Sequence, residues 1–465
     1  MAKTPVIAIF DVGKTNKKLF LFDEQYKMVF ERTAKFNETT DEDGDACENL
    51  ESLRLSVFDS LREVFKTKQF DIKAIDFSTY GASFVYIDEE GNPLTPLYNY
   101  LKEYPEALKQ QFYDAYGGEE KFSQQTASPV LGSLNSGMQL YRLKYERPEL
   151  FDKIKYALHL PQYMSYLISG TAYSDITSIG CHTNLWDFQR KDYHEWVYKE
   201  GIHQKLAPIL PSDNILPAAF PGNKYGVGVG LHDSSAALIP YLVNFHDPFL
   251  LISTGTWCIS FNPFNESPLS YDELKKDCLC YLTYKGKPVK ASRLFAGYEH
   301  EQQVKKIASH FLVAPGFYKA MEYDADIIAA LKRKQADKKR SIENETALNV
   351  QSAFSQRVLS EFKNESEAYH CLIMDIMDQQ KVSSQLVMTG TEVKRIFVDG
   401  GFSKNPIYMN LLAKSFPDIE VYAASVAQAT ATGTALSIHR FWNKKALPAD
   451  MIELKYYAVK QGVDC

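Results

Sequence analysis

Residues 6–22 read VIAIFDVGKTNKKLFLF, an apolar run, a short polar turn around Gly13, and a second apolar run. Short runs rich in β-branched and aromatic residues, bounded by Gly, Thr and Asn, are typical of strands, so the segment predicts two strands joined by a tight turn. Residues 249–261, FLLISTGTWCISF, repeat the pattern around Gly255. The recurrence predicts two related halves that begin with the same strand pair.

Apolar residues at spacings of three and four predict helices between the strands. These helices are expected at residues 50–65, 136–146, 154–168, 353–380 and 406–415. Another strand pair is expected at residues 76–81 and 84–87, and the acidic stretch 37–51 is expected to be a solvated loop. The pattern predicts a mixed α/β fold with two domains, residues 1–245 and 246–465, which suits the length of the chain.

The composition excludes several classes of protein. The chain has 465 residues and a formal net charge of −6, so no basic excess points to nucleic acid. No apolar run approaches the roughly 18 residues that cross a bilayer, and residues 1–5 lead into a strand without a signal peptide. The seven cysteines are odd in number and scattered, which argues against a disulfide framework. We expect a cytoplasmic protein with no membrane partner.

Two familiar nucleotide-binding patterns fail on spacing. Residues 13–15, Gly-Lys-Thr, resemble the end of a P-loop, but that motif needs a glycine five positions before Gly13, where the chain has Ala8. Residues 226–230 alternate Gly and Val, but Leu231 stands where a dinucleotide-binding motif needs its third glycine. The two polar turns remain, and their backbone N–H groups and threonine hydroxyls can converge on phosphate oxygens. Two ordinary β-turns are the alternative interpretation.

Asp233 is the candidate for a general base. It lies in His232-Asp233-Ser234-Ser235, directly before the apolar helical pattern that begins at Ala236. A carboxylate that deprotonates a hydroxyl must be ionised and fixed, and a helix N-terminus favours both. An Asp in this position is also a common helix N-cap, and the two interpretations are compatible.

A glycine pair follows the strand pattern at residues 393–398. Gly400 and Gly401 permit close approach of a ligand to the backbone, and Asn405 offers an amide before a helix that begins near Pro406. A flat adenine ring could lie against this turn. A plain connection between a strand and a helix is the alternative.

In this order, the motifs resemble those of the FGGY carbohydrate kinase family, within the actin, Hsp70 and hexokinase superfamily, over nearly the whole chain. The resemblance implies two actin-like (ribonuclease H-like) domains flanking a cleft for ATP and sugar. Residues 11–16 resemble the first phosphate motif, in which Asp11 would help to hold Mg²⁺ through water, and residues 253–256 resemble the second. Residues 230–236 resemble the segment that carries the catalytic base, here Asp233, and residues 400–405 the adenine-binding turn.

The ATP- and phosphate-binding residues implied by this resemblance come from the three turns and one further glycine. They are Gly13, Lys14, Thr15, Asn16, Gly255, Thr256, Gly297, Gly400, Gly401 and Asn405. Lys14 departs from the family, which has Thr or Ala at this position, and Gln428 stands where the family usually has Glu.

Within the family, residues 135–186 look most like rhamnulokinases, which points toward a deoxy-ketose. The residues expected to bind the sugar depart from that pattern. Rhamnulokinases show Trp-Gly-Val-Asp where this chain has residues 80–83, Tyr-Gly-Ala-Ser, and an Arg-Asp pair where it has residues 101–102, Leu-Lys, so a substrate-binding carboxylate is missing. The candidate substrate-binding residues are Tyr80, Gly81, Asn99, Tyr100 and Asp233.

The sequence therefore predicts an ATP-dependent kinase that transfers the γ-phosphate to a hydroxyl of a ketose or related sugar, such as rhamnulose, fuculose or xylulose. ATP and Mg²⁺ are the expected cofactors, a small sugar and MgATP the expected partners, and a homodimer is left open. A non-catalytic sensor of ATP and sugar is the alternative, supported by the altered sugar side. A chaperone-like ATPase would need a peptide-binding domain, for which no residues remain.

Overall fold

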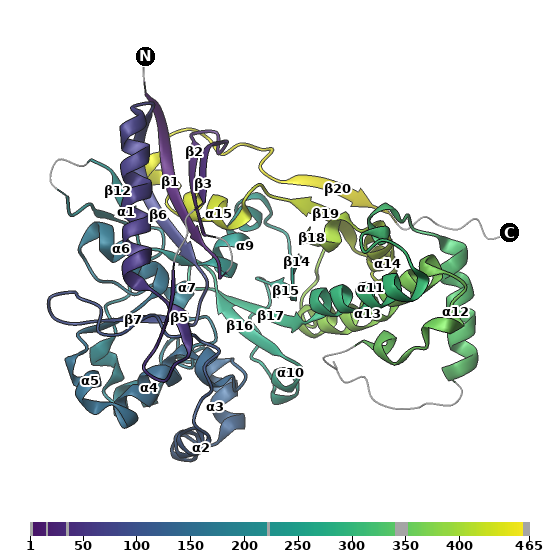
Figure 1. Ribbon diagram of the computed structural model, residues 1–465, viewed down its shortest axis with the longest axis horizontal. Helices are drawn as coiled ribbons and strands as arrows, with labels where there is room; N and C mark the ends of the chain where they lie inside the picture. Colours follow the sequence, from purple (N-terminus) through teal and green to yellow (C-terminus); the bar gives the residue numbers. More distant parts are fainter. Residues whose placement is uncertain (1–2, 15–16, 34–36, 221–223, 340–351, 459–465) are drawn as a thin grey trace.

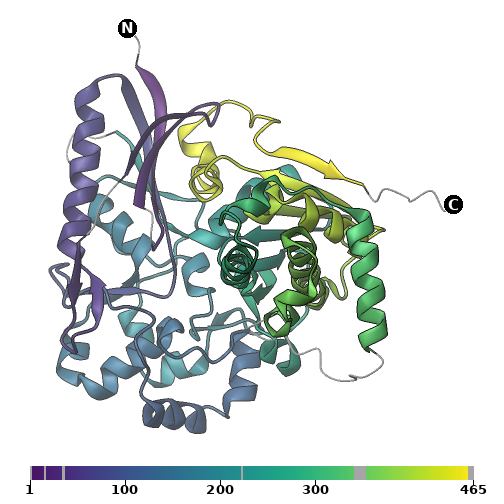
Figure 2. The same cartoon turned by 45° about the vertical axis from the view of Figure 1, so that its right-hand side comes forward.

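The computed structural model of the protein describes residues 3–14, 17–33, 37–220, 224–339 and 352–458. Its two large β-sheets form the cores of two lobes that lie side by side, one coloured purple to blue and the other mainly green (Figure 1, Figure 2). The first sheet is built from residues 4–232 and the second from residues 249–457. Among the described residues, no helix combines the length and apolar character that crossing a bilayer requires.

The first sheet has a central strand whose apolar run is buried on both faces. In spatial order its strands are β11 (Ile215–Pro217), β12 (Gly226–Gly228), β6 (Phe70–Thr79), β1 (Thr4–Val12), β2 (Lys17–Asp23) and β3 (Met28–Thr33), with β13 (Leu231–His232) beside the end of β6. The central strand is β1, which pairs antiparallel with β2 and parallel with β6. The predicted first strand pair is therefore confirmed.

The second sheet repeats this plan. In spatial order its strands are β16 (Cys278–Leu282), β17 (Pro288–Leu294), β15 (Cys258–Asn262), β14 (Phe249–Thr254), β18 (Arg395–Gly400), β19 (Glu420–Ser425) and β20 (Glu453–Tyr457). Here β14 pairs antiparallel with β15 and parallel with β18, which is parallel to β19. Order and direction match those of the first sheet around β1, so the predicted relation between the two halves is confirmed.

Helices and short strands connect and cover these sheets. The first half contains α1 (Leu50–Thr67), α2 (Glu106–Ala115), α3 (Glu119–Thr126), α4 (Ser136–Glu146), α5 (Pro148–Lys153), α6 (Leu160–Ser169), α7 (Ile176–Ile179), α8 (Glu195–Lys199) and α9 (Asp233–Asn244), and the strands β4 (Glu38–Thr40), β5 (Ala46–Glu48), β7 (Phe84–Ile87), β8 (Tyr156–His159), β9 (Trp186–Asp187) and β10 (Asp192–Tyr193). The second contains α10 (Tyr271–Lys275), α11 (Ala296–Phe311), α12 (Ala325–Lys339), α13 (Glu365–Met388), α14 (Pro406–Ser415), α15 (Ala429–Ser437) and α16 (His439–Trp442).

Three of the five predicted helices agree closely with α1, α4 and α14, and the other two are wrong in part. The pattern at 154–168 divides into β8 and α6, because a proline in the first turn of α6 favours a helix start there. The pattern at 353–380 becomes regular helix only in α13, whose first turn is capped by the side chain of Asn364. The expected pairing of 76–81 with 84–87 is also wrong, since β7 pairs with β8.

The acidic stretch at 37–51 is not a solvated loop. It forms the antiparallel hairpin β4–β5 and runs into α1, and the side chains of Asp41 and Glu48 are buried. Asp41 accepts hydrogen bonds from the backbone N–H groups of Asp43 and Asp45, and its other oxygen pairs with Lys102 at 2.6 Å. Composition alone misled here, because the carboxylates are satisfied by a turn and by a distant lysine.

The two halves are joined by helix packing as well as by the chain. Helix α15 crosses α9 so closely that a Cβ at Gly433 would overlap the carbonyl oxygen of Ala236. The apolar face of α15 and Trp442 of α16 also cover the first sheet, where they share a core with Ile7 and Phe20 (Figure 1). Residues from the end of the chain thus complete the core of the first lobe.

Candidate active site

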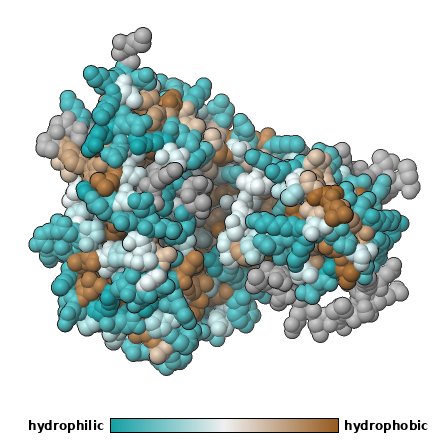
Figure 3. All heavy atoms as spheres, viewed as in Figure 1, coloured by the Kyte–Doolittle hydropathy of each residue, from teal (hydrophilic) through white to brown (hydrophobic). Residues whose placement is uncertain are grey.

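Both sheets direct the carboxyl ends of parallel strands toward the cleft between the lobes, where the surface is hollowed in Figure 3. In the first sheet, β1, β6 and β13 end side by side, with Val12 and His232 both paired to Thr79. In the second sheet, β14 and β18 end together, with Thr254 paired to Gly400. Binding sites of open α/β sheets lie outside such strand ends.

Asp233 occupies the first position of α9 and faces this cleft. His232 is the N-cap residue, so the interpretation of Asp233 as the cap is wrong; the Asp233 carboxylate instead accepts the N–H of Ser234 at 2.6 Å. Burial raises the pKa of Asp233 to about 6. Asp233 lines a cavity of about 310 Å³ together with Asp399 and Gly400 of the other lobe. A nearly neutral pKa in a cleft is suited to general-base chemistry.

Asp11 supplies a second carboxylate at the end of β1. It accepts a hydrogen bond from the Ser78 hydroxyl at 3.1 Å. Burial raises the pKa of Asp11 to about 6, and the charge of Asp233 contributes to the same shift. The two carboxylates therefore repel each other, and a cation bound beside Asp11 would relieve that repulsion. Mg²⁺ prefers oxygen ligands and binds through one or two carboxylates plus substrate phosphates, so this donor set fits it.

A cavity of about 640 Å³ in the second lobe brings together four of the residues predicted to bind ATP: Gly255, Gly297, Gly401 and Asn405. Gly297, at the start of α11, lies so close to the turn at Gly255 that a Cβ would overlap that carbonyl oxygen. His300, Tyr318, Lys319 and Lys404 are among its other lining residues. An apolar hollow with a few polar groups, bounded by glycines, suits a nucleotide.

The two adjacent glycines at the end of β18 differ in their surroundings. Gly400 has φ of +91° and no room for a side chain, because a Cβ would overlap the carbonyl oxygen of Thr254. Gly401 has φ of −63°, and a Cβ would lie 3.8 Å from the same oxygen. Asn405 also caps α14, since its side-chain oxygen accepts the N–H of Ile407 at 3.0 Å.

Replacing Gly401 by Val should raise the KM for ATP by about tenfold or more and leave the KM for the sugar largely unchanged. The backbone at Gly401 accepts a side chain without strain, so the added methyl groups would project into the 640 Å³ cavity. Steric overlap of this kind costs about 1–3 kcal/mol. A cost of about 1.4 kcal/mol corresponds to a tenfold loss of affinity. Steady-state kinetics with either substrate varied measure the effect. An unchanged KM for ATP, with an unchanged melting temperature, would place the nucleotide elsewhere.

Two tyrosines predicted to bind substrate lie together near Asp233. The rings of Tyr80 and Tyr100 are 5.8 Å apart. Burial raises the pKa of Tyr100, and the charges of Asp233 and Glu48 add to the shift, so Tyr100 lies within reach of both carboxylates. Gly81 packs beside them, with its hypothetical Cβ 2.8 Å from the His232 ring.

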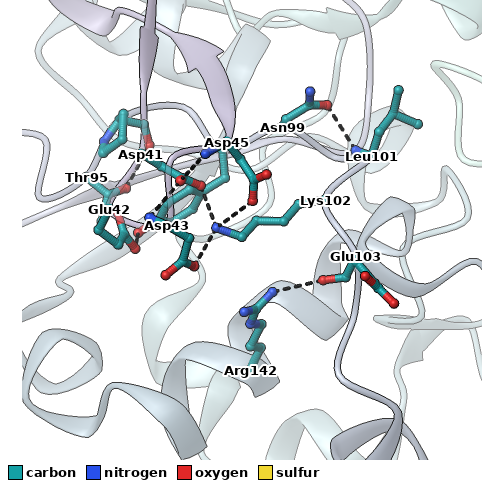
Figure 4. A network of polar contacts seen from close by, with 12 residues as sticks. Asp41, Glu42, Asp43, Asp45, Thr95, Asn99, Leu101, Lys102, Glu103 and Arg142 are labelled. Atoms are coloured by element: carbon teal, nitrogen blue, oxygen red, sulfur yellow. Dashed lines mark hydrogen bonds and ion pairs between the residues drawn. The ribbon is translucent and has the colours of Figure 1, made fainter.

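The remaining predicted site residues are less closely grouped. Asn99 lines a separate cavity of about 240 Å³, and its side-chain oxygen accepts the N–H of Leu101 (Figure 4). Thr256 is exposed, and its carbonyl accepts the N–H of Tyr298 at 3.1 Å. Thr15 and Asn16 lie outside the described residues.

Comparison with known proteins agrees with this arrangement. Residues 6–237 match the N-terminal domain of the FGGY family of carbohydrate kinases, and residues 246–446 match the C-terminal domain of the same family. The chain belongs to the FGGY family. The gap between the two matches, residues 238–245, covers the second part of α9 and the residue after it.

Relatives of this FGGY chain are distant in sequence. It is 22% identical to the rhamnulokinase of Mannheimia succiniciproducens over 274 residues, 54% of this chain and 52% of that protein. It is 24% identical to the L-fuculokinase of Escherichia coli K12 over 277 residues, 55% of this chain and 56% of that protein. The chain thus spans about half the length of the curated relatives it matches.

Solved structures match this FGGY chain over nearly its full length. A carbohydrate kinase from Novosphingobium aromaticivorans has a TM-score of 0.79 and 22% identity, with 98% of this chain and 95% of that chain covered. A ligand-bound xylulose kinase from Lactobacillus acidophilus has a TM-score of 0.77 and 14% identity, with 97% and 93% covered. The predicted two-domain, actin-like α/β fold is therefore confirmed.

Two residues of the FGGY chain's site were not named among the predicted binding residues. Thr254 joins two site turns, because its hydroxyl donates to the Asp399 carbonyl at 2.6 Å and its carbonyl accepts the N–H of Gly401 at 2.8 Å. Its place within residues 253–256, which resemble the second phosphate motif, was the available signal. Glu48, a buried carboxylate near Tyr80, was hidden within an acidic stretch. No pattern marked it as different from its exposed neighbours.

Proposed function

We propose that this FGGY chain transfers the γ-phosphate of ATP to a hydroxyl of a ketose or related sugar, such as rhamnulose, fuculose or xylulose. The observation that carries the proposal is the pair of buried carboxylates, Asp11 and Asp233, at strand ends of the first lobe. They lie at the cleft whose other side holds the glycine-bounded cavity. Residues 1–245 and 246–465 are proposed as the two domains that close on the substrates.

In this mechanism Asp233 orients the sugar hydroxyl and accepts its proton. The hydroxyl oxygen forms a bond to the γ-phosphorus as the bond to the bridging oxygen of ADP breaks, so the electron pair of that bond leaves with ADP. Backbone N–H groups near Gly13, Gly255 and Gly297 would donate to phosphate oxygens. Asp11 would be the residue that holds Mg²⁺, and the bound ion would supply positive charge beside the phosphates.

A sensor that binds ATP and sugar without phosphoryl transfer is the second candidate. The absence of a carboxylate at Ser83, directly before β7, favours it. The presence of both Asp11 and Asp233 favours the kinase, because a sensor has no need of a base with a nearly neutral pKa. A cytoplasmic location and a homodimer remain predictions.

A coupled assay of ADP release over a panel of sugars tests the proposal. L-rhamnulose, L-fuculose, D-xylulose, D-gluconate and glycerol cover ketoses, a sugar acid and a polyol. We expect Mg²⁺-dependent ADP release above the sugar-free rate with at least one ketose. Calorimetric binding of MgATP and of a panel sugar without ADP release would support the sensor instead.

A further inference from the structure

The Lys14 side chain is directed toward Tyr80 and Tyr100, the two tyrosines predicted to bind substrate. Its ammonium lies 5.5 Å from the centre of the Tyr80 ring and 5.6 Å from that of Tyr100. These distances are within the range of cation–π contact. The Lys14 side chain is 39% exposed, so an incoming ligand can reach it.

The carboxylate of Glu48 forms an ion pair with this lysine. This carboxylate lies 3.5 Å from the Lys14 ammonium and 3.2 Å from that of Lys17, and the Glu48 side chain is only 4% exposed. Burial raises the pKa of the Tyr80 hydroxyl, and the charge of Glu48 and a hydrogen bond to it raise that pKa further. Glu48 therefore interacts with both the lysine and the tyrosine.

The hairpin that carries Glu48 is fixed to the loop that carries Tyr100. The Lys102 ammonium lies 2.6 Å from carboxylate oxygens of Asp41 and Asp43 and 3.2 Å from one of Asp45 (Figure 4). Backbone hydrogen bonds join Glu48 and Leu97 in both directions. Because three carboxylates of the β4–β5 turn converge on one ammonium, the position of Glu48 relative to this loop is well defined.

We propose that Lys14 binds the sugar, and that Glu48 is the positioning residue that holds its ammonium over Tyr80 and Tyr100. An ammonium has three donors, and one directed toward Glu48 leaves others for hydroxyl or carboxylate oxygens of a substrate. In this proposal Lys14 and Glu48 supply the polar contacts to the sugar that Ser83, which lacks a carboxylate, does not supply. The inference rests on the proposed function and replaces the expectation that Lys14 contacts phosphate.

Lys14→Met should raise the KM for the best panel sugar by about tenfold or more, which corresponds to the loss of one hydrogen bond to a charged group. The KM for ATP should change less than about twofold. Lys14→Arg, which keeps the charge, should restore part of the sugar affinity. Glu48→Gln should act like Lys14→Met on the sugar, because the lysine would lose its anchor.

Lys155→Met is a matched control. Its side chain is 41% exposed, its ammonium lies 3.1 Å from Glu89 and 5.6 Å from the Tyr156 ring, and it lines a surface hollow that contains none of the candidate site residues. We expect no change in either KM. Comparing the effect of Lys14→Met on D-gluconate with its effect on the ketoses distinguishes a carboxylate from a hydroxyl as the group that Lys14 binds.

Melting temperatures provide a readout that does not require turnover. In Lys14→Met and Glu48→Gln, the shift produced by the sugar should be lost and the shift produced by ADP with Mg²⁺ kept. Loss of the ADP shift with the sugar shift intact would overturn the inference, and so would two unchanged shifts. If the parent neither binds nor phosphorylates any panel sugar, the proposed function fails and the inference with it. An active parent with unaffected variants overturns the inference alone.

Discussion

Replacing Asp233 by Asn should lower kcat on the best sugar by about 10²–10⁴-fold, the usual contribution of general-base catalysis. The amide has nearly the same size but cannot accept the hydroxyl proton. His232 occupies the N-cap position of α9 without a side-chain hydrogen bond, and the Asn side chain keeps an oxygen that can accept the N–H of Ser234. The melting temperature and ATP binding should therefore change little. Kinetic assays measure the change in kcat, and calorimetry measures the binding of ATP.

The pH dependence of the parent provides a second readout for the same residue. Burial raises the pKa of Asp233 to about 6, so kcat/KM should fall as pH is lowered through that value, because the protonated acid cannot act as a base. Asp11 also has a pKa of about 6, and the observed midpoint belongs to the interacting pair.

A buried carboxylate outside the cleft serves as the control for Asp233. Asp375 pairs with Arg357 at 2.6 Å in the second lobe. Asp375→Asn should lower the melting temperature and leave kcat nearly unchanged, the reverse of the result expected for Asp233→Asn. If Asp233→Asn turns over within a few-fold of the parent, Asp233 is not the base.

Replacing Asp11 by Asn should lower kcat/KM for MgATP by about 10–100-fold, the range seen when a group that orients a metal ligand is lost. The amide keeps a hydrogen-bond acceptor for Ser78 but loses the negative charge that would attract Mg²⁺. ATP should raise the melting temperature of the parent much more with Mg²⁺ than without it. In the variant this difference should shrink.

Titration of Mg²⁺ at fixed ATP separates a metal effect from a general loss of folding. The variant should need a higher Mg²⁺ concentration for half-maximal activity. Its melting temperature without ligands should be at least that of the parent, because the amide removes the buried charge that Asp233 repels. Equal protection by ATP with and without Mg²⁺ in the parent would remove the proposed role of Asp11.

The fold could be predicted largely because one local pattern, two short apolar runs joined by a glycine-containing turn, occurs twice in the sequence. The strand pairs around Gly13 and Gly255 are encoded by short apolar runs and turn residues, and both lie where the sequence predicts them. The hairpin β4–β5 could not be predicted in the same way. Its polar residues resemble a solvated loop, and its stability comes from Lys102, a contact distant in sequence.

The site shows the same division between local and distant signals. Gly255, Gly297 and Gly401 were predicted from motifs and share one cavity, because glycines mark close approach of backbone and ligand. Glu48 could not be predicted, since its importance depends on its burial beneath Lys14 and beside Tyr80. A carboxylate gains a role when the fold removes it from water, and sequence alone does not report that burial.

The packing of α15 and α16 on the first sheet has a consequence for biosynthesis. Tyr26 contacts His439 and Trp442, and Asn443 donates a hydrogen bond to the carbonyl of Glu24. During translation the first lobe emerges hundreds of residues before these partners, at roughly 5–20 residues per second. The part of the sheet face that α15 and α16 cover therefore stays uncovered on the ribosome until residues 429–442 have been made, a period in which chaperones would have access to Ile7 and Phe20.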